Sequence, residues 1–402
     1  MTSDVNAGGQ LLLPESLRRF STCHGNVYGY LAVDRMVHGL CGGGIRIVPV
    51  VDPEELIALA RTMTRKYAYL GLPIGGAKAA VVDEMGGSSL TLRKESLRDF
   101  ARQLRPLANC YLPGKDEGMN DEEYRFFMNC LGRPQNYIAD SAYHTAVSVL
   151  LSMEELLNHV GAMKLKKSII IEGFGKVGRW TARLAAERGW LVVAVADRDG
   201  VVYDPEGLDV DKLSKGNDAV GNSGFRACGR GRLLPLAALC ELRATVFSPC
   251  AGAWTIGRDQ AEKLNVWFIV GGANNPVTDE AKKTLSLRGI VYFPDFVANC
   301  GGVAGSMIES LCRNKARAAR ILDTELRRKL RRLLAAQPDP SSLEEGALKM
   351  VGDILAISAR TGTRSAGAVF SPFLSVYRRG WFPSWLEAII GPLYMRAALR
   401  GL

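Results

Sequence analysis

The chain has 402 residues, of which 47% are hydrophobic and 23% are charged. This length accommodates two domains with a core each, and the composition is that of an ordinary globular protein. No stretch reaches the roughly 18 apolar residues that a membrane span needs, and the amino terminus lacks the pattern of a secretory signal. We therefore expect a cytoplasmic protein without a membrane span.

The nine cysteines are an odd number, and no two of them form a Cys-x-x-Cys pair. Most have apolar sequence neighbours, which favours reduced thiols in a protein core over a disulfide framework or a zinc site. The spacing of the histidines and cysteines predicts no metal site.

The net charge of +10 raises the question of a nucleic-acid partner. Much of the excess lies in residues 313–332, where apolar side chains recur at helical spacing between arginines and lysines. An amphipathic helix with a solvated basic face is the favoured interpretation, and a surface for phosphate or a polyanion stays open. No nucleic-acid-binding module accompanies the segment, so we expect no nucleic-acid partner.

The first 150 residues or so mix predicted strands with predicted helices. Apolar side chains recur at helical spacing through Pro53–Tyr69, and Asp52 is placed to cap that helix. Further elements expected in this part are strands at Tyr28–Asp34, Ile45–Val50 and Ala79–Asp83 and a helix at Leu92–Leu104.

Lys78 is the last residue of the segment Leu72–Lys78, whose other residues are small or apolar and include Gly75 and Gly76. A lysine held in such surroundings loses hydration, which lowers its pKa. It can then exchange protons near neutral pH or activate a carbonyl group, and the glycines leave room for a substrate to approach.

From residue 166 the pattern changes to a strand, a glycine turn, a helix and a second strand. The strand at Ser168–Ile171 leads into Gly173-x-Gly175-x-x-Gly178, and a helix at Lys176–Arg188 and a strand at Leu191–Ala196 follow. This order predicts one βαβ unit of a doubly wound sheet. Later strands are expected at Val246–Pro249, Val266–Val270 and Ile290–Phe293, and the Gly- and Arg-rich segment 214–232 is expected to be a surface loop.

The glycine turn predicts a dinucleotide site, because it follows a buried strand and opens a helix. Its residues are Gly173, Gly175, Lys176, Val177 and Gly178. Asp197 ends the next strand, where its carboxylate can accept hydrogen bonds from a ribose and repel a 2′-phosphate. We therefore predict NAD, and the neighbouring Arg198 leaves NADP open. A reactive lysine with a nicotinamide coenzyme suggests redox chemistry at a carbon that bears nitrogen.

The carboxyl-terminal stretch 371–402 combines aromatic residues with three prolines. An oligomer contact or packing against the first domain is the favoured interpretation. Association with a membrane surface stays open, although the prolines interrupt any long amphipathic helix.

Short blocks in colinear order resemble the glutamate/leucine/phenylalanine/valine dehydrogenase family over roughly residues 27–309. Besides the glycine fingerprint, the matching blocks are Gly42–Arg46, Met63–Lys66, Leu72–Lys78, Pro113–Gly118, His144–Ala146, Pro249–Ala251, Gly272–Pro276 and Pro294–Val303.

The resemblance implies roles for individual residues. Lys66 matches the family's lysine for the substrate α-carboxylate, Lys78 its catalytic lysine and Asp116 its proton-transferring aspartate. The chemistry of these residue types agrees, because a carboxylate needs a cation, an iminium needs a polarising ammonium and an amine must exchange a proton. Taken alone, each would also suit an exposed turn or helix end. Positions that contact the coenzyme in the family are matched by Thr145, Asn274 and Asn299.

One departure from the family bears on the substrate. Glutamate-specific members carry a lysine for the side-chain carboxylate where this chain has Gly42, just before Gly43. A buried carboxylate without a cation is heavily penalised, so Gly42 predicts a wide, uncharged space for a large apolar side chain. Ser306 matches a serine that helps glutamate-type members hold that carboxylate, but a hydroxyl cannot replace a cation. Ala79, Ala80 and Glu172 are further departures, which would signal altered geometry or reduced activity.

Together these features predict an α/β protein with a substrate domain at residues 1–145, a Rossmann-type domain at 146–305 and carboxyl-terminal helices at 306–402. The resemblance implies a homo-oligomer that deaminates an L-amino acid oxidatively, releasing a 2-oxo acid and ammonia and reducing NAD(P). The side chain is expected to be apolar or aromatic. Two alternatives stay open: a glutamate dehydrogenase that uses another cation such as Arg46, and a relative without turnover that has a regulatory role.

Overall fold

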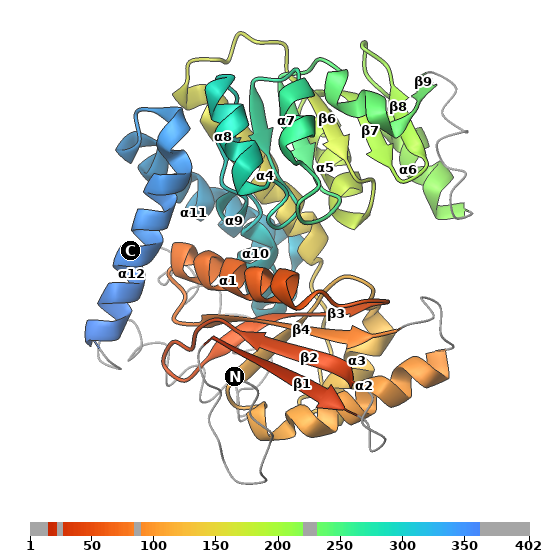
Figure 1. Ribbon diagram of the computed structural model, residues 1–402, viewed down its shortest axis with the longest axis vertical. Helices are drawn as coiled ribbons and strands as arrows, with labels where there is room; N and C mark the ends of the chain where they lie inside the picture. Colours follow the sequence, from red (N-terminus) through yellow and green to blue (C-terminus); the bar gives the residue numbers. More distant parts are fainter. Residues whose placement is uncertain (1–14, 22–26, 84–89, 220–230, 362–402) are drawn as a thin grey trace. The chain divides into compact units, whose positions relative to one another are not determined.

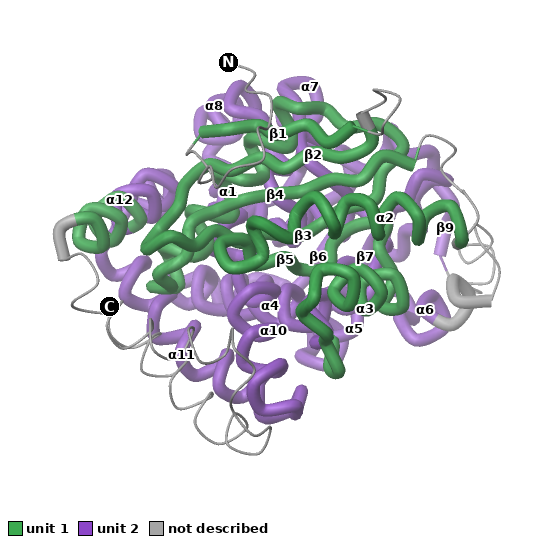
Figure 2. The backbone as a smooth tube through the Cα atoms, turned by 90° about the horizontal axis from the view of Figure 1, so that it is seen from below, with its two compact units in different colours: residues 1–138, 351–390, 397–402 green, residues 139–350, 391–396 purple. Residues whose placement is uncertain are grey.

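The computed structural model describes residues 15–21, 27–83, 90–219 and 231–361, and these residues form two compact units (Figures 1 and 2). Unit 1 contains the described residues up to Ile138 and those from Val351 onward, whereas unit 2 runs from Ala139 to Met350. The division thus lies before the predicted boundary at 145, and residues 306–350 group with unit 2. The tail 371–402 is outside the described residues.

Unit 1 is built on a five-stranded mixed sheet in the order β1-β2-β4-β3-β5. β1 and β2 run antiparallel to their neighbours, while β3 lies parallel to both β4 and β5. The strands are β1 (Ser16–Ser21), β2 (Val27–Val33), β3 (Cys41–Val48), β4 (Gly75–Val82) and β5 (Tyr111–Lys115).

Helices cover both faces of this sheet (Figure 1). The helix α1 (Pro53–Leu70) packs Leu56 and Ala60 against Ala32 and Ala80. On the other face lies a larger apolar core, to which α2 (Leu90–Leu104), the short helix η1 (Arg105–Leu107) and α3 (Asp121–Cys130) contribute. Because side chains alternate along a strand, neighbouring residues of β3 and β4 face opposite helices.

The helix α1 confirms its sequence prediction. Asp52 caps it by accepting a hydrogen bond from the Glu54 N–H at 2.8 Å, Pro53 takes the first helical position, and Gly71 ends it at φ 76°. The cap, the proline and the glycine are local signals, so no distant contact is needed to place the ends.

The strand β3 begins earlier than predicted, at Cys41 instead of Ile45. After Cys41 come the three glycines Gly42–Gly44, which have no side chains and so give no alternating pattern that would predict a strand. They are held extended because β3 lies between β4 and β5 and pairs with both. This difference matters, because it places the glycine block inside the sheet.

Unit 2 is a doubly wound sheet in the order β12-β11-β10-β6-β7-β8-β9, which confirms the predicted fold class. The first five strands are parallel, and β8 and β9 are antiparallel additions. The strands are β6 (Ser168–Glu172), β7 (Leu191–Asp197), β8 (Gly200–Tyr203), β9 (Arg232–Leu234), β10 (Val246–Pro249), β11 (Phe268–Val270) and β12 (Val291–Phe293).

Helices flank the sheet of unit 2 on both faces (Figure 1). The core of one face joins Ile170 and Phe247 to residues of α7 and α8. The helices are α4 (Ser141–His159), α5 (Lys176–Glu187), α6 (Val210–Ala219), η3 (Leu236–Glu241), α7 (Arg258–Lys263), α8 (Asp279–Leu287), α9 (Asp295–Ala298), α10 (Gly301–Cys312), α11 (Lys315–Ala336) and η4 (Pro340–Ser342). The helix α12 (Leu343–Thr361) passes from unit 2 into unit 1.

The expectation of a loop over 214–232 is wrong at both ends. Helix α6 begins at Val210, where the Asp209 carboxylate accepts a hydrogen bond from the Lys212 N–H, and it continues to Ala219, whereas β9 begins at Arg232. Residues 220–230 lie outside the described part of the chain.

The basic segment forms α11, a helix as predicted. Part of its charge is neutralised within unit 2, where Arg327 and Arg331 each bind Glu155 of α4 at 2.8 Å. Arg327 also binds Glu154 at 2.5 Å. These pairs favour the interpretation of α11 as a packed amphipathic helix over a polyanion-binding surface.

The seven cysteines in the described residues are free thiols. Burial raises the pKa of Cys41 to about 12 and that of Cys250 to about 11, so these thiols are poor nucleophiles. None of the described helices is long and apolar enough to cross a membrane. The described residues also contain no group of three His, Cys, Asp or Glu side chains able to hold a metal ion.

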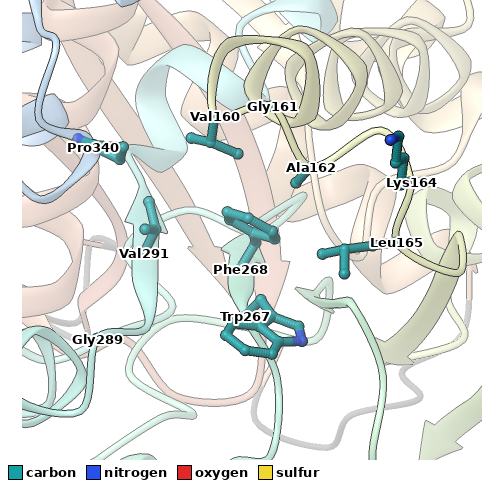
Figure 3. A pocket seen from close by; sticks show the side chains of 10 residues that line it. All are labelled: Val160, Gly161, Ala162, Lys164, Leu165, Trp267, Phe268, Gly289, Val291 and Pro340. Atoms are coloured by element: carbon teal, nitrogen blue, oxygen red, sulfur yellow. The ribbon is translucent and has the colours of Figure 1, made fainter.

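A cavity of about 400 Å³ opens at the amino-terminal ends of β11 and β12 (Figure 3). Trp267, Phe268 and Leu165 line it, with Lys164 at its edge. It lies across the sheet from the glycine fingerprint, which follows the carboxyl end of β6, and it contains none of the site residues predicted from the sequence.

Candidate functional site

Lys78 and Asp116 form an ion pair in unit 1 between Lys78 Nζ and Asp116 Oδ2. Lys78 lies on β4 with 3% of its side chain exposed, and Asp116 follows β5 with 27% exposed. The strand β3 runs between them, so the two side chains meet above it. The pair is possible because β3 has Gly44 here: a Cβ at this position would stand 2.6 Å from the Asp116 Cβ.

The charges around Asp116 determine its protonation state. Burial alone would raise the pKa of this carboxyl group, but the cations of Lys78 and Arg46 outweigh that effect and hold its pKa well below its usual range. Asp116 is therefore ionised at neutral pH and faces an ammonium group. An acceptor and a donor in direct contact can pass a proton to and from a bound amine.

Arg46 faces three carboxylates. Its Nη1 binds Glu55 Oε1 at 2.8 Å, its Nη2 lies 3.6 Å from Glu117 Oε2, and its Nε lies 3.7 Å from Asp116 Oδ2. The guanidinium thus balances charges that are already present. This arrangement disfavours Arg46 as the cation for a substrate's second carboxylate.

Lys66 and Tyr67 are neighbours near the end of α1, and both are buried. The Tyr67 hydroxyl would stand 2.6 Å from a Cβ at Gly42. The prediction of a wide space beside Gly42 is therefore wrong, because the phenol of Tyr67 occupies that space. Gly43 points its Cα hydrogen at the Ala77 carbonyl, and its own carbonyl accepts a 2.9 Å hydrogen bond from the Tyr111 hydroxyl.

Tyr67 is the residue that sequence reasoning missed. Its signal was present, since Tyr67 follows Ala60 by seven positions and Met63 by four, which places it on the buried face of the predicted helix. Only the position of β3 beneath α1 shows that its hydroxyl meets Gly42.

The glycine fingerprint in unit 2 forms the turn from β6 to α5. Gly173 has φ 88°, a backbone conformation that residues with a side chain rarely adopt. At Gly178 a Cβ would stand 1.9 Å from the Gly173 carbonyl oxygen, so this position also requires glycine. Gly175 is the N-cap of α5, and among the described residues no side chain caps that end. Lys176 and Val177 form the first turn. Its backbone N–H groups are thus available to an anion such as a pyrophosphate.

Asp197 ends β7, as predicted. Burial raises its pKa, although its Oδ1 accepts a 2.8 Å hydrogen bond from the Asp199 N–H, which works against that rise. Arg198 is exposed beside it. The carboxylate stands at the carboxyl end of the strand next to β6, where parallel sheets bind nucleotides.

Asn299, at the end of α9, reaches Asn274 in the loop after β11. Asn299 Nδ2 donates to Ala273 O at 2.8 Å and to Asn274 Oδ1 at 3.1 Å. Asn299 Oδ1 is buried without a hydrogen-bond partner in the described residues, so an acceptor is left for a ligand. Asp295, which the sequence left without a role, holds the same loop by accepting from the Asn275 N–H at 2.9 Å.

Thr145 and Ser306 lie on α4 and α10, which pack together. Thr145 Oγ1 donates to Ser141 O at 2.8 Å, and Ser306 Oγ is buried without a partner in the described residues. Nearby, His144 Nε2 lies 2.7 Å from Glu309 Oε2, a buried contact that ties α4 to α10. The predicted residues thus fall into one cluster in unit 1 and a second set in unit 2.

Comparison with known proteins identifies the family. The family model for glutamate/leucine/phenylalanine/valine dehydrogenase matches residues 138–338, and that for the dimerisation domain of Glu/Leu/Phe/Val dehydrogenases matches residues 21–131. The chain belongs to this family. It is therefore an amino-acid dehydrogenase, an oxidoreductase acting on CH–NH2 donors, in a family that uses NAD or NADP.

Individual relatives agree with this assignment. The chain is 31% identical to a glutamate dehydrogenase of Thermotoga maritima over 75% of its length and 76% of the relative's. The hetero-hexameric glutamate dehydrogenase of Thermus thermophilus, in its leucine-bound form, is 25% identical with a TM-score of 0.76, covering 86% of this chain and 89% of that one. L-tryptophan dehydrogenase of Nostoc punctiforme, at 19% identity and a TM-score of 0.61 over 86% of this chain and 92% of its own, shares the fold.

Proposed function

We propose that this dehydrogenase catalyses the reversible oxidative deamination of an L-amino acid with an apolar side chain, using NAD. The observation that carries the proposal is the buried ion pair of Lys78 and Asp116. A buried lysine beside an ionised aspartate is a costly arrangement for stability alone, and it supplies the donor and acceptor that this reaction needs.

The residues of unit 1 would act as follows. Lys66 binds the α-carboxylate of the substrate. Asp116 accepts a proton from the substrate amine, which frees the nitrogen lone pair. The hydride on Cα would pass to the bound coenzyme, which leaves an iminium. Lys78 would hold the water that attacks this iminium by a hydrogen bond and exchange protons with it, and the tetrahedral adduct would then lose ammonia, which takes the hydroxyl proton, to leave the 2-oxo acid.

The residues of unit 2 fit a nicotinamide dinucleotide. The turn at Gly175, which no side chain of the described residues caps, suits a pyrophosphate, and Asp197 suits a ribose. Asn299 Oδ1, which has no hydrogen-bond partner among the described residues, suits the amide of a nicotinamide. Thr145 and Asn274 would complete that end of the site. When bound, the coenzyme supplies a hydride acceptor. The preference for NAD over NADP rests on the Asp197 carboxylate, which would repel a 2′-phosphate.

The preference for an apolar side chain rests on two features of unit 1. Position 42 meets a neutral phenol where glutamate-type relatives carry a lysine, and Arg46 is already balanced by carboxylates. A second candidate, glutamate, is favoured by the buried Ser306 hydroxyl and by the relatives named as glutamate dehydrogenases. We further propose a homo-oligomer in the cytoplasm, where the free thiols would stay reduced.

The test is the formation of NADH or NADPH at 340 nm, followed spectrophotometrically with a panel of L-amino acids. We expect turnover with NAD and a higher kcat/KM for aliphatic substrates than for glutamate. A preference for glutamate would establish the second candidate. No turnover with any amino acid and either coenzyme would favour the relative without turnover instead.

A further inference from the structure

We propose that Tyr67 is a specificity-determining residue: its hydroxyl closes the side-chain end of the substrate site and restricts it to short, uncharged side chains such as those of valine and leucine. This inference rests on the proposed function. It goes beyond it by naming the residue that limits the substrate and the class of side chain that results.

Position 42 and Lys78 share one face of the sheet in unit 1. Gly42 pairs with Gly76 and Ile45 with Ala79, so Gly42 and Gly44 of β3 lie on the same face as Gly76 and Lys78 of β4. This is the face that α1 covers, since a Cβ at Gly76 would stand 2.3 Å from the Thr64 backbone nitrogen. Lys78, position 42 and the Tyr67 hydroxyl that meets it therefore lie on the same face of the sheet.

The spacing of residues along β3 limits the length of the side chain that fits between the ion pair and position 42. Lys78 and Asp116 meet above Gly44, and Gly42 lies two residues away, or roughly 7 Å at the rise of a β-strand. A substrate whose amine contacts the ion pair could place a side chain of a few carbon atoms over this distance. In the opposite direction along β3 lies Arg46, surrounded by Glu55 and Glu117, which leaves a charged environment unsuited to an apolar side chain.

Tyr67 places a neutral hydroxyl group at position 42. Its side chain is buried, and its hydroxyl stands where a side chain at position 42 would begin. Burial raises the pKa of this phenol, helped by Cys41 and Tyr124, so the group is neutral at physiological pH. The side-chain carboxylate of a glutamate substrate would contact this hydroxyl without a compensating positive charge. The aromatic ring of a larger substrate would collide with the Tyr67 side chain.

The test compares kcat/KM for valine, leucine, phenylalanine, tryptophan and glutamate in the wild type and in Tyr67→Ala and Tyr67→Phe. We expect the wild type to prefer valine or leucine. Tyr67→Ala should raise the phenylalanine-to-valine ratio at least about tenfold, in line with the 10- to 200-fold discrimination that a pocket exerts over small differences in side-chain size. Tyr67→Phe, which removes only the hydroxyl, should shift the ratio in the same direction by less.

Tyr28→Phe is the matched control, because it removes a phenol hydroxyl that accepts a 2.7 Å hydrogen bond from Gln103 Nε2 and lies at the apolar core to which α2 and α3 contribute. It should leave the ranking of substrates unchanged. A rank order that stays the same in both Tyr67 variants would overturn the inference while the proposed function stands. A wild type that oxidises no amino acid would overturn the proposed function itself.

Gly42→Lys supplies a second line of evidence that does not depend on Tyr67→Ala folding. Because a side chain at position 42 would collide with the Tyr67 hydroxyl, the single variant should lose activity toward every substrate without a gain for glutamate. Gly42→Lys combined with Tyr67→Phe should recover activity and improve glutamate relative to valine. A single variant that already prefers glutamate would show that Tyr67 does not close the site.

Discussion

The two groups of candidate site residues are built in opposite ways. In unit 1, the candidate residues are charged side chains that form ion pairs with one another: Lys78 pairs with Asp116, and Arg46 faces three carboxylates. In unit 2, the candidate residues offer backbone N–H groups and polar atoms that have no partner within the part of the chain that the structure describes, such as the turn at Gly175 and the buried Asn299 Oδ1. The comparison suggests that unit 1 is set up for proton transfer, while unit 2 is set up to receive a ligand.

The largest effect should follow from Lys78→Ala. It removes the ammonium group of the ion pair, so we expect kcat to fall by roughly 10²- to 10⁴-fold, the usual contribution of a positioned acid or base. NADH binding, measured by fluorescence titration, should persist because it depends on unit 2. Lys94→Ala is the control, since Lys94 pairs with Glu122 on the surface of unit 1. Near-normal kcat in folded Lys78→Ala would mean that the assignment is mistaken.

Asp116→Asn should come next. The amide keeps the shape of the carboxylate but cannot accept the amine proton, so we expect kcat to fall by roughly 10²-fold. The control is Glu117→Gln, whose side chain is 66% exposed and also faces Arg46. Full activity of Asp116→Asn across the pH range would reduce Asp116 to a structural partner of Lys78.

A smaller effect is expected at Asp197, on coenzyme choice alone. Asp197→Ser removes the carboxylate that repels a 2′-phosphate, so the ratio of NADPH to NADH affinity should rise by about tenfold, or about 1.4 kcal/mol. Fluorescence titration of both coenzymes measures it, with Asp199→Ser as the control on the same turn. Tighter binding of NADPH by the wild type would show that Arg198 dominates instead.

The smallest effect concerns stability at Glu172, which precedes the glycine turn. Burial raises the pKa of this carboxyl group above its ordinary value of 4.5, although a 2.9 Å hydrogen bond from Thr255 works against the rise. Because the pKa is higher in the folded than in the unfolded state, protonated Glu172 contributes fully to the free energy of unfolding below pH 4.5. That contribution is lost as the pH rises through the folded-state pKa. Glu172→Gln keeps an acceptor for Thr255 and does not titrate.

We therefore expect the melting temperature of Glu172→Gln to match that of the wild type at pH 4 and to exceed it at pH 8. Glu187→Gln, a surface member of an ion pair with Arg183, is the control. A gain in melting temperature that does not depend on pH would show that Glu172 is not the titrating group.

The sequence by itself determined the parts that depend on local signals. The ends of α1 follow from Asp52, Pro53 and Gly71, and the turn from β6 to α5 follows from its glycines, because caps and left-handed residues act within a few positions. The colinear blocks also predicted the family and the fold class. Cofactor preference, substrate and the roles of single residues stay predictions.

Only the tertiary structure decided what meets what across the sheet of unit 1. Glycines in β3 carry no side-chain pattern, so nothing local shows that Asp116 reaches Lys78 above Gly44 or that Tyr67 fills the space at Gly42. The sequence shows that position 42 has no side chain, and an open pocket was predicted from that. The sequence does not show that α1 places the Tyr67 side chain at this position, because that contact joins residues distant in the chain through the packing of a helix on a sheet.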